Sequence, residues 1–137
     1  MQSLYAAIHF SFLHILNTHW HFITGDICPA GHFCPQGTIT PHECPPGQFC
    51  KTTRLSKPSG NCSSGYYCTG KAVVATQHDC TVGHYCPVGS HKPWPCPEGT
   101  FSNATLNREE GQCSNCTAGY YCAGQGNHEV TGQCSEG

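Results

Sequence analysis

The chain has 137 residues, a formal net charge of −2 at pH 7, and 13 cysteines beside 16 glycines and 10 prolines. From Cys28 onward it holds only eight Ile, Leu or Val residues, too few to build one large hydrophobic core. The net charge is uninformative, and we find no basic stripe or cluster of Lys and Arg of the kind that binds phosphates. The sequence therefore predicts no nucleic-acid partner.

Residues 1–27 differ in composition from the rest of the chain, because they contain no cysteine. Their position and the small-residue pair Thr24-Gly25 favour a secretory signal peptide, although no Lys or Arg precedes the apolar stretch. The alternative is the arbitrary leader of a fragment. The apolar stretch is interrupted by His9 and His14, and we expect no membrane-spanning segment in it or after it.

A seven-residue motif recurs from Cys28 onward, with cysteine first, glycine fourth, an aromatic residue sixth and, except in the fifth copy, cysteine seventh. We number the copies motif 1 to motif 6; they occupy residues 28–34, 44–50, 62–68, 80–86, 96–102 and 116–122. The intervals between first cysteines are 16, 18 and 18 residues, then 16, 20 and 18 up to Cys134. The repeated series indicates two three-motif units, 28–79 and 80–133, with 134–137 as the truncated start of a third.

Each motif position has an expected structural role. The glycine suits a positive φ, and the second-position prolines are expected to set the first corner of a turn. The aromatic side chain is expected to pack on a neighbouring disulfide or on the glycine turn. The segments between motifs have β-branched residues without helical periodicity, which predicts short strands and loops and no helix beyond Cys28. The predicted fold is small and disulfide-rich: an elongated tandem array of short β-hairpin and loop repeats.

So many cysteines in a chain with so little aliphatic core predict a disulfide scaffold, in which each bridge contributes about 2–4 kcal/mol. Disulfides persist in oxidising compartments. The sequence therefore predicts an extracellular or cell-surface location.

The duplication restricts the cysteine pairing without fixing it. Motif 5 has Ser102 where motif 2 has Cys50, and it gains Cys113 opposite Ser59, which suggests that both cysteines serve the same kind of partner. Our hypothesis is pairing within motifs, in which Cys113 replaces the missing seventh cysteine of motif 5. It joins Cys28 to Cys34, Cys44 to Cys50, Cys62 to Cys68, Cys80 to Cys86, Cys96 to Cys113 and Cys116 to Cys122, and leaves Cys134 unpaired. The competing scheme links motifs forward, as in Cys50 to Cys62 and Cys113 to Cys116, whose tight loop is typical of redox enzymes.

Nothing in the sequence indicates catalysis or a cofactor. The CSNC segment at 113–116 has redox-type spacing but lacks the βαβ context in which such motifs act. The chain's ten histidines and thirteen cysteines leave a metal-binding or thiol-redox protein as the alternative function, although the cysteine spacing differs from paired zinc knuckles. We therefore expect no enzymatic activity.

Three sequons suit a secreted chain: Asn61-Cys-Ser, Asn103-Ala-Thr and Asn115-Cys-Thr. Asn103 is the preferred glycosylation site, because the other two precede a cysteine that is expected to be oxidised.

The motifs CPAGHFC and CPPGQFC, followed by CPEGTFSN and CSNCTAGYYC, resemble the ephrin-receptor-like cysteine-rich repeat of the growth-factor-receptor cysteine-rich superfamily. The resemblance covers residues 28–137 and implies a spacer or protein-binding segment of a larger surface or secreted protein, with other extracellular proteins as partners. The family's bridge cysteines correspond to Cys96, Cys113, Cys116 and their repeats. Ephrin binding and kinase activity reside in separate domains and are not implied. Exposed aromatic residues are candidate contacts, namely Tyr66, Trp94 and Tyr120.

Overall fold

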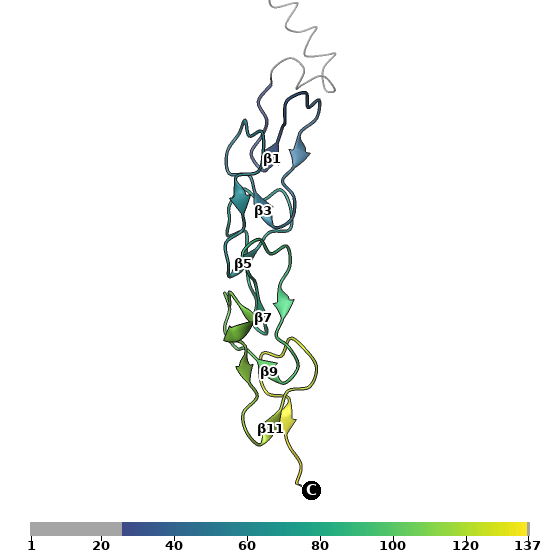
Figure 1. Cartoon of the computed structure of the whole chain (residues 1–137), viewed down its shortest axis with the longest axis vertical. Coiled ribbons are helices and arrows are strands. Elements are labelled where there is room, and N and C mark those ends of the chain that lie inside the picture. Colours follow the sequence, from purple (N-terminus) through teal and green to yellow (C-terminus); the bar gives the residue numbers. More distant parts are fainter. Residues whose placement is uncertain (1–25, 137) are drawn as a thin grey trace, which may run out of the picture.

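The computed structural model describes residues 26–136, which form a narrow rod with the two ends of this segment at opposite ends of the rod (Figure 1). Its strands are two residues long and form six antiparallel hairpins along the rod. This confirms the predicted disulfide-rich array of short hairpins. Most of the predicted signal peptide, residues 1–25, lies outside the described residues. The strands are β1 (His32–Phe33), β2 (His42–Glu43), β3 (Gln48–Phe49), β4 (Gly60–Asn61), β5 (Tyr66–Tyr67), β6 (His78–Asp79), β7 (His84–Tyr85), β8 (Trp94–Pro95), β9 (Thr100–Phe101), β10 (Ser114–Asn115), β11 (Tyr120–Tyr121) and β12 (Gly132–Gln133).

Every motif opens with a tight turn, as motif 1 illustrates. The His32 N–H donates to the Pro29 carbonyl at 3.2 Å, and Gly31 between them has φ +78°. A hydrogen bond across four residues with positive φ at the third is the pattern of a type II turn. Pro29 is therefore the first residue of the turn, and Ala30 is its first corner. The role predicted for the second-position prolines is wrong.

Each hairpin leads from one motif to the next. In the first, His32 pairs with Glu43 and Phe33 pairs with His42. The first strand of a hairpin is thus the fifth and sixth residues of a motif, and the second strand is the pair of residues just before the next motif's first cysteine.

The motif glycine is bonded forward through both of its backbone groups. The Gly47 N–H donates to the carbonyl of Cys68, the last residue of the next motif, at 2.8 Å. The Gly47 carbonyl accepts from the N–H of Cys62, the first residue of that motif, at 2.9 Å. The same pair of bonds recurs for the glycines of motifs 1 to 5. Neighbouring motifs are therefore joined directly by backbone.

From motif 2 onward, the loop that follows a motif folds back and bonds to the preceding motif. Lys71, in the loop after motif 3, donates from its N–H to the Cys44 carbonyl of motif 2 at 2.9 Å. Ala72 accepts from the Cys50 N–H at 2.8 Å. Equivalent loops close over motifs 1, 3, 4 and 5 in the same way. Each motif is thus held by the next one and by the next one's loop.

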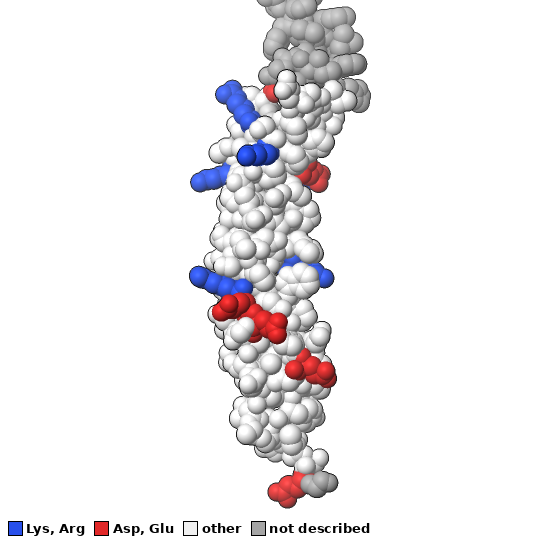
Figure 2. All heavy atoms as spheres, viewed as in Figure 1, with Lys and Arg blue, Asp and Glu red and all other residues white. Residues whose placement is uncertain are grey.

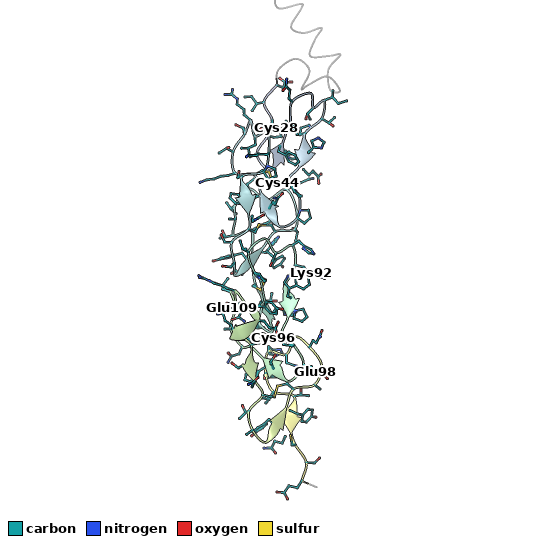
Figure 3. The ribbon with its side chains drawn as sticks, viewed as in Figure 1. Cys28, Cys44, Lys92, Cys96, Glu98 and Glu109 are labelled. Carbon is teal, nitrogen blue, oxygen red and sulfur yellow. A yellow bond between two sulfur atoms is a disulfide. The ribbon has the colours of Figure 1, made fainter. Side chains whose placement is uncertain are left out.

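The core is a column of disulfides. The bridges are Cys28–Cys34, Cys44–Cys50, Cys62–Cys68, Cys80–Cys86, Cys96–Cys113 and Cys116–Cys122, the pairs of the within-motif scheme. Figure 3 shows Cys28, Cys44 and Cys96 along the middle of the rod. Phe49 packs against the next bridge and Ala72, as expected for the motif aromatic. Burial of half-cystines here replaces burial of aliphatic side chains.

The described residues contain one short 3₁₀ turn, η1 (Glu110–Gln112), which the sequence analysis did not foresee. The Glu109 N–H is capped by the Gln112 side chain at 3.2 Å, and the Cys113 N–H donates to the Glu110 carbonyl at 2.9 Å. Three residues are too few to leave a helical period in the sequence. Within residues 26–136, no helix has the length and apolar character needed to cross a bilayer.

Candidate interaction surfaces

Motif 5 replaces its second cysteine with a hydrogen-bonded pair of polar side chains. Ser102 and Asn107 are 4% and 3% exposed, and the Asn107 amide donates to the Ser102 hydroxyl at 2.7 Å. The same amide donates to the His84 carbonyl of motif 4 at 3.0 Å. Both buried groups are therefore satisfied, as burial of polar groups requires. Ser102, the seventh residue of motif 5, is therefore buried although it forms no disulfide.

The two cysteines of the CSNC segment belong to different bridges. Cys113 is bonded to Cys96, and Cys116 is bonded to Cys122. A thiol oxidoreductase cycles through a disulfide between the two cysteines of its own CxxC, so the segment has the wrong connectivity for that chemistry. Cys134 is a free and exposed thiol.

Two histidines pack against the aromatic side chains of the motifs. His42 lies 5.3 Å from the Phe33 ring and His78 lies 5.0 Å from the Tyr67 ring, each as a cross-strand partner. Across the described part of the chain, no three His, Cys, Asp or Glu side chains are placed to hold a metal ion. Histidine therefore contributes here to hairpin packing.

The most elaborate aromatic surface lies on hairpin β7–β8. Trp94 is 38% exposed and pairs across the hairpin with Tyr85. The Lys92 ammonium lies 4.8 Å from the centroid of the Trp94 ring, and His91 meets that ring edge-on at 5.9 Å. The other two predicted contact aromatics, Tyr66 and Tyr120, lie on hairpins of motifs 3 and 6, so the three do not form one patch.

Tyr85 lies beside a carboxylate at the edge of this surface. Partial burial, the negative charge of Glu110 and a hydrogen bond from the phenol to Glu110 at 3.4 Å all raise the pKa of Tyr85 above its ordinary 10.0. Each of these favours the neutral phenol in the folded chain. The contribution of Tyr85 to stability is therefore fully present below pH 10.0 and is lost as the pH rises from there through the raised pKa of the folded chain.

We expect Glu110→Gln to lower the pKa of Tyr85, because it removes the adjacent negative charge while partial burial remains. Spectrophotometric titration of the tyrosines would detect the shift. Glu98→Gln removes an exposed carboxylate elsewhere and is the matched control. An unchanged titration in Glu110→Gln would show that the carboxylate does not act on Tyr85.

Two shallow hollows lie near the N-terminal end of the rod. One of about 440 Å³ is lined by Asp26, Ile27, Cys28, Cys34, Arg54 and Leu55, and one of about 370 Å³ by residues 35–40 and His42. Neither brings together an acid, a base and a nucleophile in the geometry of a catalytic site. The surface itself is therefore the better candidate for function.

Charge is unevenly distributed along the rod. Figure 2 shows Lys and Arg side chains gathered toward the N-terminal end, while Asp and Glu dominate the other end. Residues 26–79 carry four basic residues and three carboxylates, whereas residues 80–136 carry two basic residues and five carboxylates. The four basic residues of the first segment are Lys51, Arg54, Lys57 and Lys71. The expectation of no Lys and Arg cluster is therefore wrong for this end of the rod. The spacing of three residues between Lys51, Arg54 and Lys57 could have indicated the cluster.

The chain matches no family model and no curated protein. Its likeness to ephrin-receptor-like repeats thus rests on the motif itself and stays a prediction. What the structure establishes is a disulfide-rich array of β-hairpin repeats, and its many disulfides favour an extracellular or secreted location.

Proposed function

We propose that the chain is a non-enzymatic extracellular segment that acts as a stiff spacer and interaction module in a larger surface or secreted protein. The observation that carries the proposal is the unbroken series of backbone bonds between motifs. Gly31, Gly47, Gly65, Gly83 and Gly99 each bond to the following motif, so residues 28–122 contain no flexible linker. A rod with nearest-neighbour contacts can hold other domains at a fixed separation.

The chemistry of the side chains supports the same role. Twelve cysteines are oxidised in pairs and so are withheld from metal or redox chemistry. The ephrin-receptor-like appearance of the motifs supports a place among extracellular repeats of receptors, adhesion proteins or matrix proteins.

Small-angle X-ray scattering of the secreted chain tests the spacer role. A compact domain of 137 residues would have a radius of gyration of about 14 Å. We expect a value well above that, with the pair-distance distribution of a rod, unchanged by a metal chelator. A value near the compact figure, or collapse on chelation, would contradict the proposal. Reduced protein is the control for loss of the rod.

We further propose that Asn103 carries an N-linked glycan. It is exposed in the loop after β9, whereas Asn61 and Asn115 lie in β4 and β10, each directly before a bridged cysteine. We expect Asn103→Gln to abolish the mobility shift that a glycan-removing enzyme causes in the secreted protein. Asn61→Gln and Asn115→Gln should leave that shift intact. Loss of the shift in either control instead would refute the assignment to Asn103.

A further inference from the structure

One surface of the rod carries positive charges without matching negative ones. The segment KTTRLSK at residues 51–57, here called the basic loop, joins β3 to β4 and presents Lys51, Arg54 and Lys57. All three residues are exposed, and none has an ion-pair partner among residues 26–136. No carboxylate occurs in the sequence between Glu43 and Asp79. The basic loop is thus a local concentration of free positive charge.

The basic loop is fixed to the rod by backbone bonds. The Arg54 N–H donates to the Cys28 carbonyl at 2.9 Å, and the Leu55 carbonyl accepts from the Cys34 N–H at 2.7 Å. The Lys51 N–H donates to the Ser59 hydroxyl at 3.0 Å. The backbone that carries Lys51 and Arg54 is therefore fixed before any partner binds, which reduces the ordering cost of binding.

The backbone position of Arg54 is one that favours glycine. Arg54 has φ +64°, and the equivalent positions in the loops after motifs 4 and 6 are Gly89 and Gly126. A residue with a side chain costs about 1–2 kcal/mol in this region. The equivalent residue in the loop after motif 3 is Lys71, with φ +52°. The equivalent residue in the loop after motif 5 is Leu106, with φ +62°. Three of the five equivalent loops thus hold a side chain in a conformation that costs stability, and two of these three side chains are basic.

The carboxylates that adjoin this surface offset only part of its charge. Lys71 pairs with Glu43 at 3.0 Å, and Asp26 lines the same hollow as Arg54. Four basic residues against two carboxylates leave an excess of two positive charges. At near-neutral pH an extended polyanion would meet attraction here and repulsion at the acidic opposite end of the rod.

We propose that the basic loop, with Lys71, binds a sulfated polysaccharide. Its closely spaced sulfates match three exposed cations that follow one another at intervals of three residues along the basic loop. An oxidising extracellular compartment is where such polymers occur. The basic loop has no aromatic residue on which a nucleic-acid base could stack. Its one aliphatic side chain, Leu55, is half-buried, so it offers no apolar face for insertion into a membrane. This inference rests on the proposed extracellular function. It names sulfated polysaccharides as the class of ligand that the interaction module binds.

The test measures binding of the secreted, oxidised chain to immobilised heparin as a function of salt. We expect Lys51→Gln/Arg54→Gln/Lys57→Gln to lose at least about tenfold in affinity and to flatten the salt dependence, because fewer counterions are released. The control variant Lys92→Gln/Arg108→Gln removes two basic residues outside the proposed binding surface. It should change the affinity less than about twofold, because these residues are expected to contact no sulfate and to release no counterions. Lys51→Gln/Lys57→Gln leaves Arg54 and its strained backbone untouched and should give an intermediate loss.

Three outcomes would overturn the inference: equal heparin binding by wild type and the triple variant, equal binding to desulfated heparin, or equally tight binding to duplex DNA or phosphatidylserine vesicles. Each variant is first shown to keep its bridges and its rod-like scattering. A chain that is a rod in solution but does not bind heparin contradicts only the ligand assignment, whereas loss of the rod contradicts the proposed function.

Discussion

Gly83→Ala is expected to destabilise the rod by about 3 kcal/mol, among the larger effects of a single substitution. Gly83 has φ +74°, where a side chain alone costs about 1–2 kcal/mol. A Cβ at this position would also collide with the carbonyl oxygen of Gly126. Because Gly83 bonds to both Ser102 and Cys96, any shift that relieves the collision strains the junction between motifs 4 and 5.

The chain offers a matched control in motif 5. Gly99 has φ +83°, but a Cβ there would have no atom within 4 Å. Gly99→Ala should therefore cost only about 1–2 kcal/mol, from the backbone conformation. Gly47→Ala, whose Cβ would lie 2.5 Å from the Gly89 oxygen, should resemble Gly83→Ala.

Denaturant unfolding with the disulfides intact would measure these differences, and hydrogen exchange would locate them. We expect faster exchange across motifs 4 and 5 in Gly83→Ala than in Gly99→Ala. Equal losses of stability in the two variants would show that the close approach of loop to glycine does not hold the rod together.

Ser102→Cys is expected to move a disulfide. The backbone of motif 5 is bonded like that of motif 4, since Ser102 accepts from the Gly83 N–H at 2.7 Å just as Cys86 accepts from the Gly65 N–H at 2.7 Å. A cysteine at position 102 would thus face Cys96, just as the seventh residue faces the first in motifs 1 to 4 and in motif 6. The shorter loop also closes with about 0.9 kcal/mol less entropy cost during oxidative folding.

Cys113 should then become a free thiol, and thiol labelling should rise from one site to two. Stability should fall by at least about 1 kcal/mol, because the shorter loop restricts the unfolded chain less. The loss of the hydrogen bond from the buried Asn107 amide to the Ser102 hydroxyl adds to this fall. Retention of the Cys96–Cys113 bridge, with label on the new cysteine alone, would show that motif 5 closes differently from the others.

The reciprocal control lies in motif 2. Ser59 directly precedes β4 as Cys113 directly precedes β10, so Ser59→Cys creates the same set of three cysteines around Cys44. The Cys44–Cys50 bridge should persist and the new thiol should be labelled. Transfer of the bridge to residue 59 would instead indicate that the longer loop is intrinsically preferred.

Much of this architecture could be predicted because it repeats. The recurrence of cysteine, glycine and aromatic residues indicated short hairpins around disulfides, and the exchange of Ser102 for Cys113 indicated which cysteines share a partner. Both signals are local in the sequence. A duplicated unit also supplies two examples of each feature. A residue type that recurs at the same position in both units is one that the structure requires.

The contacts between motifs could not be predicted in the same way. The bond from Lys71 to Cys44 and the approach of Gly126 to Gly83 join residues 27 and 43 positions apart, and they depend on the rotation of one motif relative to the next. No side-chain pattern encodes a bond between two backbone groups. Arg54 has a positive φ, as Gly89 and Gly126 do at the equivalent positions of their loops. Because Arg54 is not a glycine, the sequence does not indicate that these loops share a conformation.

The candidate surface was the least predictable part. Lys51, Arg54 and Lys57 are only a spaced series in the sequence, and their importance depends on the loop that fixes them and on the distribution of carboxylates along the rod. The predicted aromatic contacts stay a prediction. Trp94 and Tyr120 are exposed, whereas Tyr66 is half-buried and lies on a separate hairpin.

Disulfide mapping of the non-reduced, secreted chain tests the central claim most directly, because the core of the rod is a column of these bridges. Each motif's first cysteine pairs with its own seventh residue or, in motif 5, with Cys113. Mass spectrometry of its peptides should find Cys28–Cys34, Cys44–Cys50, Cys62–Cys68, Cys80–Cys86, Cys96–Cys113 and Cys116–Cys122, with label on Cys134. A bridge between motifs, such as Cys34–Cys44 or Cys50–Cys62, or many labelled thiols with bound zinc, would contradict it.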